Sequence, residues 1–297
     1  MTSTWSNSIE KNLFLISKLP DSLQGKLIKA FQQHYEELYE PEATAYLQDA
    51  IDDILTAFQS NDPKLTHLRY VWMALIFAVV VEPTVKYYQP DNSVPKATIN
   101  RVAIWLIETL AELLDSKVKF NEASREIEAN VIVNHLLTKK DTNFQVLFEA
   151  LNVYKSVVKS LDANQSLEAL LDILDDSLEG YAIFPGSQGR RELFDWWLLE
   201  VVPASWYLFS PSYIYCVNKS THSKQIASCQ ISELNQISNL MWSLIRESYK
   251  NRRNTNKDKD INQQFLKSTS EHHEDKIKSY LQIPPNQFMI NEYENIC

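Results

Sequence analysis

The sequence predicts an all-α protein, built as a multi-helix globular bundle. Only 4 of its 297 residues are glycine, whereas sheets and phosphate-binding loops need glycine in tight turns, and average proteins contain about 7 %. Hydrophobic residues make up 44 % of the chain and charged residues 23 %, a balance that allows a buried core. Apolar residues also recur three and four positions apart along most of the chain, which is the period of a helix.

Helix-start and helix-stop residues divide the chain into elements. Asp21 is a favourable N-cap, Pro41 suits the first turn of a second helix, and Asp62 with Pro63 opens a third. Pro203 is expected to stop a later helix, because proline has no N–H to continue it. The predicted helices cover residues 21–39, 41–60, from 62 onwards, 99–114, 121–137, 143–161, 165–178, 190–202 and 232–249.

The longest apolar run belongs to the third helix. Residues 70–81 are apolar throughout, so we expect this helix to be buried on all sides at the centre of the core. Twelve residues are too few to cross a bilayer, and Glu82 followed by Pro83 is expected to close the run. We therefore do not expect an integral membrane protein.

The second half of the chain contains one departure from helical spacing. Tyr213, Tyr215 and Val217 alternate with other residues ahead of a polar, turn-like stretch. This pattern leaves room for one small β-hairpin near residues 212–230. Helical spacing returns after residue 232.

The domain organisation follows from where large apolar residues occur. Residues 1–250 contain nearly all of them and are expected to form a compact helical domain, which can consist of two packed halves with a boundary near residue 160. Residues 251–297 contain few and are expected to form a polar C-terminal arm.

Charge and cysteine content limit the class of protein. The net charge of −9 disfavours a general nucleic-acid-binding protein, which needs a basic surface. The three cysteines all follow residue 215, so a secreted disulfide scaffold is not expected. The N-terminus lacks the basic start and long apolar stretch of a signal peptide. These observations favour a cytoplasmic protein, and nothing in the sequence specifies its oligomeric state.

Two aspartate clusters suggest a metal site, but their spacing opposes it. The first comprises Asp49, Asp52 and Asp53, and a similar cluster follows at residues 172–176. Carboxylates three and four apart share a helix face and can hold magnesium. At 100° per residue, however, both clusters point away from the apolar stripe of their helix. We interpret them as solvated faces and expect no metal and no cofactor.

The segment of residues 179–197 holds three of the four glycines, with arginines close behind. Ser187, Arg190 and Arg191 lie at the start of a predicted helix, where N–H groups and guanidiniums can hold a phosphate or carboxylate. The spacing matches neither a P-loop nor a nucleophile elbow. A simple turn, a site for an anion or an acidic partner, and a catalytic site all remain open.

Aromatic residues gather directly after this turn. Residues 181–215 contain ten of them, including Trp196, Trp197 and Trp206. Tryptophan, tyrosine and arginine together are typical of interface hot spots, although core packing and a pocket for a flat ligand are alternatives. The candidate binding residues are Ser187, Arg190, Arg191, Trp196, Trp197 and Trp206.

These observations favour a non-enzymatic interaction, assembly or regulatory protein that contacts another protein through an aromatic and arginine surface around residues 187–206. No nucleophile triad, metal set or phosphate loop indicates an enzyme. One alternative is a helical enzyme or carrier, in which Arg190 and Arg191 hold the anionic head of an apolar ligand. A second is a regulator that contacts nucleic acid through the basic run at residues 246–259.

Overall fold

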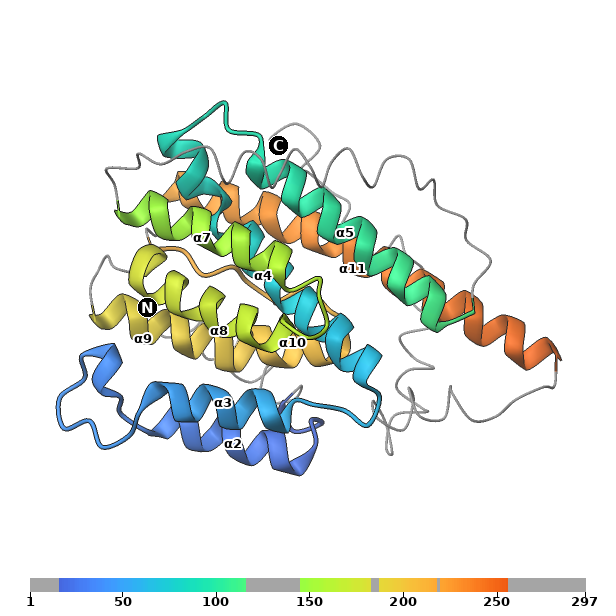
Figure 1. The fold of residues 1–297 in the computed structure, drawn as a ribbon, viewed down its shortest axis with the longest axis horizontal. Helices are drawn as coiled ribbons and strands as arrows, with labels where there is room; N and C mark the ends of the chain where they lie inside the picture. Colours follow the sequence, from blue (N-terminus) through green and yellow to red (C-terminus); the bar gives the residue numbers. More distant parts are fainter. Residues whose placement is uncertain (1–15, 116–144, 183–186, 218–219, 256–297) are drawn as a thin grey trace.

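Helices make up the regular structure of the protein, as predicted (Figure 1). This computed structural model describes residues 16–115, 145–182, 187–217 and 220–255. The described residues contain no strand, only one isolated bridge between Tyr35 and Ala45. The helices are α2 (Asp21–Gln32), α3 (Leu47–Ala57), α4 (Pro63–Tyr88), α5 (Val94–Leu113), α7 (Gln145–Lys159), α8 (Ser166–Asp176), α9 (Ser187–Trp196), α10 (Val202–Tyr207) and α11 (Thr221–Thr255). A 3-10 turn, η1 (Glu36–Leu38), and two π-helical turns, η2 (Ser177–Tyr181) and η3 (Trp197–Val201), complete the order.

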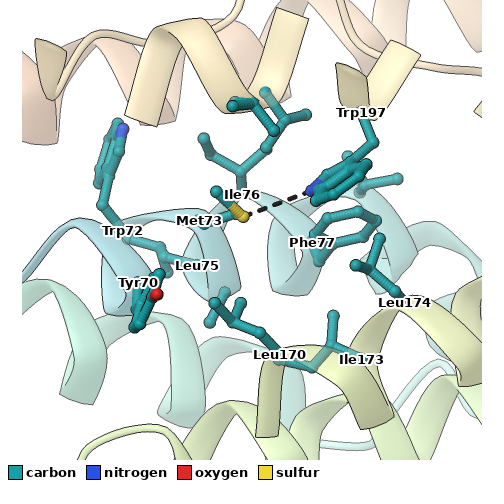
Figure 2. Close-up of a cluster of buried hydrophobic side chains, with 14 of the residues drawn as sticks. Tyr70, Trp72, Met73, Leu75, Ile76, Phe77, Leu170, Ile173, Leu174 and Trp197 are labelled. Atoms are coloured by element: carbon teal, nitrogen blue, oxygen red, sulfur yellow. Dashed lines mark hydrogen bonds between the residues drawn. The ribbon is translucent and has the colours of Figure 1, made fainter. Parts of the chain in front are cut away.

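Helix α4 lies at the centre of the molecule and contacts α5, α7, α8, α10 and α11. It begins as predicted, with the Asp62 carboxylate accepting from the Lys64 and Leu65 N–H groups. Residues 70–81 are all buried. Figure 2 shows Leu170 and Leu174 of α8 packed on one side of this helix and Trp197 on the other. The Trp197 indole N–H contacts the sulfur of Met73 at 3.3 Å.

Glu82 and Pro83 end the apolar run but not the helix, because α4 continues to Tyr88. With 26 residues, α4 is long and apolar enough to cross a membrane by length and composition, although its uninterrupted apolar run is shorter. The burial of α4 is the second property to compare with that of a membrane-spanning helix. In its most apolar 18-residue window, 89 % of the residues are buried inside the protein, as in the core helix of a globular fold.

Two side chains support the backbone of α4 around this proline. Proline has no N–H, so the carbonyl four residues earlier, that of Val79, loses its donor within the helix. The Gln230 amide of α11 donates to this carbonyl. The Tyr154 hydroxyl of α7 donates to the neighbouring Ala78 carbonyl at 2.6 Å. Neighbouring helices thus allow α4 to run through its proline.

The β-hairpin considered near residues 212–230 is not formed, because α11 begins at Thr221 and includes the second half of that range. Side chains bond the backbone of the alternating segment where a partner strand would otherwise do so. The Trp196 indole donates to the Tyr213 carbonyl at 2.9 Å, and the Tyr181 hydroxyl donates to the Tyr215 carbonyl at 3.2 Å. The alternating residues therefore belong to an irregular segment whose backbone is bonded by side chains of α9 and η2.

Several helix boundaries also differ from prediction. Pro41 does not open a helix, since residues 39–46 form a loop before α3. Pro203 does not end the helical path, because it occupies the first turn of α10 after the π-helical turn η3. There the Val202 N–H reaches back five residues to the Trp197 carbonyl. The extra residue of a π turn changes the hydrogen-bond register ahead of the proline. The predicted helix at 121–137 lies outside the described residues.

Gly180 explains part of the unusual glycine content of its segment. It lies in η2, which packs against α7. A Cβ atom at this position would lie 2.4 Å from the Cβ of Glu149, closer than van der Waals contact permits. Glycine is therefore required by the close approach of the two helices.

The predicted domains remain predictions. Residue 160 lies in the short connection between α7 and α8, which pack against each other, and both helices contribute to the same buried cluster. Helix α11 extends to Thr255 and lies beside α5 in Figure 1. The rest of the predicted arm, residues 256–297, lies outside the described residues.

The support of α4 by Gln230 can be tested with a double-mutant cycle. Gln230→Leu leaves the Val79 carbonyl unpaired in the core, so it should lower the free energy of unfolding by about 1–3 kcal/mol. In a Pro83→Ala background the new N–H can bond that carbonyl, and the same substitution should cost clearly less. Urea denaturation of the four proteins measures the coupling. Additive effects would show that Gln230 does not compensate for the proline.

Candidate functional site

The three candidate tryptophans lie inside the protein. Trp196, Trp197 and Trp206 are each at most 3 % exposed. Trp206 packs edge-on against Phe58, with ring centroids 5.5 Å apart. The expectation that these rings form a contact surface is therefore wrong. Helix α9 and η3 are surrounded by other elements, so an aromatic face on every side reflects core packing.

Arg191 of α9 forms hydrogen bonds to the C-terminal end of α2. Its Nη1 donates to the Gln33 carbonyl at 2.7 Å, and its Nη2 donates to the Phe31 carbonyl. These carbonyls lie at and just beyond the end of α2, where helices leave carbonyl groups unpaired. The guanidinium also pairs with Glu40 at 3.3 Å and with Asp195 at 2.9 Å. Arg191 therefore holds together segments that are more than 150 residues apart.

Arg190 is buried beside it and faces the same N-terminal region. Its Nη2 lies 3.4 Å from the Glu179 carboxylate. Its guanidinium lies over the ring of Tyr39, 4.5 Å from the centroid, in cation–π geometry. Both predicted arginines are thus adjacent and paired with carboxylates. Ser187 is the first residue of α9, and its side chain lies outside the described residues.

The aromatic rings that accompany these arginines at the surface come from the N-terminal region. Phe31 is 42 % exposed and lies 5.7 Å from the Arg191 guanidinium. Tyr39 is 63 % exposed, and Ile28 lies one turn before Phe31 with 48 % exposure. We call Ile28, Phe31, Tyr39, Arg190 and Arg191 the α2–α9 patch. Figure 1 shows α2 at one edge of the fold beside α3, and the contacts of this region with the α9 path run from η1 to α9 and from α2 to η3.

Backbone strain marks the loop at this patch. Tyr39 has φ 56° and Glu42 has φ 62°, so both are in the left-handed region that non-glycine residues rarely adopt. The strained Tyr39 presents its ring to solvent while its N–H bonds to the Glu36 carbonyl at 2.8 Å. Strained residues gather at functional sites more often than elsewhere. Tyr39 therefore combines an exposed ring with a strained backbone, which makes it the candidate contact residue of the patch.

A surface hollow lies on another side of α2, between that helix and α3. Lys26 and Asp53 form an ion pair of 2.6 Å there. Lys29, Tyr46 and Asp49 also line it. The charges are mixed, and neither candidate arginine lines the hollow. It therefore does not match the ligand pocket considered for Arg190 and Arg191.

The aspartate clusters make contacts between helices. Asp53 pairs with Lys26 of α2, and Asp172 pairs with Lys159 of α7 at 3.0 Å. Within the described ranges, no three His, Cys, Asp or Glu residues are grouped as a metal site requires.

Asp176 is an exception to the solvated face predicted for its cluster, since it is half-buried and bonds to Glu149. Burial, the hydrogen bond and the nearby Glu149 charge raise the pKa of Asp176 to about 8. At neutral pH the pair therefore holds a proton between α8 and α7.

The basic run considered for nucleic acid is only partly described. Arg246 donates from Nε to the Trp242 carbonyl at 3.3 Å. The side chains of residues 251–259 lie outside the described part, so nucleic-acid contact there remains a hypothesis.

The chain matches no protein-family model, no curated protein and no solved structure.

Removal of Arg191 should destabilise the fold. Arg191→Ala leaves two carboxylates and the end of α2 without their shared donor, so the free energy of unfolding should fall by about 2–4 kcal/mol. Arg191→Lys should recover only part of this loss, because an ammonium lacks the guanidinium fork. Urea denaturation measures both. Arg101→Ala on α5 removes the same charge elsewhere and should cost under about 1 kcal/mol. Equal losses at both positions would contradict the role of Arg191.

The acid pair should make stability depend on pH. The pKa of Asp176 is higher in the folded protein than in the unfolded chain, so the folded state binds the extra proton between pH values of about 4 and 8. The contribution of Asp176 is then full at low pH and is lost as the pH rises through 8. We expect the free energy of unfolding to fall between pH 5 and pH 8.5, and Asp176→Asn to flatten this fall. An unchanged slope would contradict proton sharing.

Proposed function

We propose that this protein binds another protein through the α2–α9 patch. The proposal is carried by the environment of Tyr39. This residue is 63 % exposed, its backbone is held in the left-handed conformation, and its ring contacts the Arg190 guanidinium. A flexible surface tyrosine loses side-chain freedom on binding, whereas a fixed ring has already lost much of it. Phe31, whose ring centroid lies 5.7 Å from the Arg191 guanidinium, extends the aromatic surface.

The charges around the patch favour a basic partner with apolar anchor residues. Glu36 and Glu42 are exposed on either side of Tyr39, and the whole chain has a net charge of −9. A field of this sign attracts basic proteins and repels a second copy of the same chain. The rings provide the apolar contact, and the acidic surroundings orient the partner.

The positions of the arginines support binding of a protein over binding of an anionic ligand. Both guanidiniums are already paired with carboxylates, Arg190 with Glu179 and Arg191 with Glu40 and Asp195. Neither has a free charge to offer to the head group of a small ligand. Their role in the proposal is to position Tyr39 and Phe31.

Photo-crosslinking tests where a partner binds. Benzoyl-phenylalanine replaces Tyr39 in the full-length protein, and the cross-linked proteins are identified by mass spectrometry after irradiation in a lysate of the source cells. The matched control carries the same cross-linker in place of Tyr87, which is 80 % exposed at the far end of α4. We expect a defined basic protein to be cross-linked from position 39 and not from position 87. The same proteins captured from both positions would contradict the proposal.

The purified partner then allows a quantitative comparison. Tyr39→Asn should weaken its affinity about tenfold or more, since removal of an aromatic anchor costs at least about 1.4 kcal/mol. Asparagine tolerates the left-handed conformation, so relief of strain should offset the lost cation–π contact, and thermal stability should change little. Tyr87→Asn should retain full affinity. Unchanged binding by the Tyr39 variant would rule out the patch as the contact site.

A further inference from the structure

A second arginine environment lies in the interior, away from the patch. Arg69 is in the second turn of α4 and is fully buried. Its guanidinium lies over the indole ring of Trp206 from α10, with the guanidinium carbon 3.9 Å from the ring centroid. The next residue of α10, Tyr207, is also buried and close enough for its charge state to affect that of Arg69. The site thus lies between α4 and α10, which pack together.

The polar atoms of these side chains lack hydrogen-bond partners. All three guanidinium nitrogens of Arg69 are buried and unpaired, as are the Trp206 indole nitrogen and the Tyr207 hydroxyl. Guanidinium and indole groups can only donate, and a phenol donates readily. The interior therefore contains a group of donors without an acceptor from the described protein. Leaving a charged donor unpaired in the core is among the most costly arrangements in a folded protein.

The described residues do not supply a counter-charge in contact with Arg69. Asp62, which acts on Arg69 only from a distance, accepts from the first N–H groups of α4 and is used as the helix cap. Burial lowers the pKa of Arg69 to about 9, while Tyr207 and Asp62 act in the opposite direction. The guanidinium therefore stays positive at neutral pH.

We infer that Arg69 and Tyr207 form an internal binding site for one small oxyanion of the phosphate or sulfate class. An oxyanion accepts two parallel hydrogen bonds from a guanidinium and a third from a hydroxyl. It also supplies the missing negative charge in a low-dielectric environment, where the attraction is strongest. The contact with the Trp206 ring holds the guanidinium in this position. This site is independent of the α2–α9 patch and of any partner bound there.

The burial of Arg69 determines how such an ion would behave. Since the side chain is 0 % exposed, the ion enters during folding or when α10 locally opens. Exchange is then slow, and purified protein should retain the ion through desalting. Ion chromatography of protein denatured after desalting should find about one phosphate or sulfate per chain, and none in Arg69→Met.

Thermal unfolding with phosphate tests the energetic consequence. The wild type should gain roughly 4 °C or more in Tm when refolded with phosphate at a hundred times its Kd, relative to sodium chloride of equal ionic strength. Arg69→Met, which fills the space without a charge, should show no specific gain. Without oxyanions it should be as stable as the wild type or more stable, because an unpaired charge has been removed. Tyr207→Phe should retain the gain with about tenfold weaker phosphate affinity.

One control variant tests for general salt effects, and two results would overturn the inference. Arg101→Met removes a half-buried arginine on α5 and should respond to phosphate as the wild type does, which separates the site from general salt effects. An equal response of the wild type and Arg69→Met would overturn the inference, leaving ordered water as the partner of Arg69. A large loss of stability in Arg69→Met without any oxyanion would also overturn it, because a protein carboxylate would then be the counter-ion.

Discussion

The fold depends on one helix that has to be covered on every side. Helix α4 contributes 26 residues and exposes almost none of its central apolar run. An apolar helix of this length is stable in water only when other helices enclose it. The positions of α5, α7, α8, α10 and α11 around it follow from this requirement. The molecule is therefore organised around a single central element, with α2 and α3 added at one edge (Figure 1).

Covering α4 on every side also buries its polar groups, and these groups differ in the hydrogen-bond partners that they find. The carbonyl freed by Pro83 is bonded by Gln230 of α11, although that residue is distant in the sequence. The Trp72 indole reaches the Phe209 carbonyl at 2.8 Å. Arg69, in contrast, lies over the face of Trp206 and has no hydrogen-bond partner among the described residues. Arg69 is the one described side chain of α4 whose buried nitrogen or oxygen atoms have no hydrogen-bond partner.

The sequence predicted the class of fold because helical periodicity is a local property. The cap at Asp62 and the burial of residues 70–81 could be predicted for the same reason. The passage of the helical path through Pro83 and Pro203 could not, since it depends on Gln230 in one case and on a π turn in the other. Propensity alone describes the proline and not the distant residue that compensates for it.

The proposed patch shares two residues with the site expected from the sequence. Arg190 and Arg191 do meet exposed aromatic rings, but those rings are Phe31 and Tyr39, not the neighbouring tryptophans. Composition within one segment cannot show which rings face inward. One signal was available: Ile28 and Phe31 fall outside the buried stripe formed by Leu23, Leu27 and Ala30. For Tyr39, the helix predicted through it concealed a strained loop residue.

The long reach of Arg191 has a consequence for biosynthesis. It bonds Gln33, 158 residues earlier in the chain, so α2 and α3 leave the ribosome well before Arg191 is synthesised. At synthesis rates of about 5–20 residues per second, this interval is roughly 8–30 s. Until α9 has been synthesised, α2 and α3 can pack against each other but lack the arginine that attaches them to the rest of the fold.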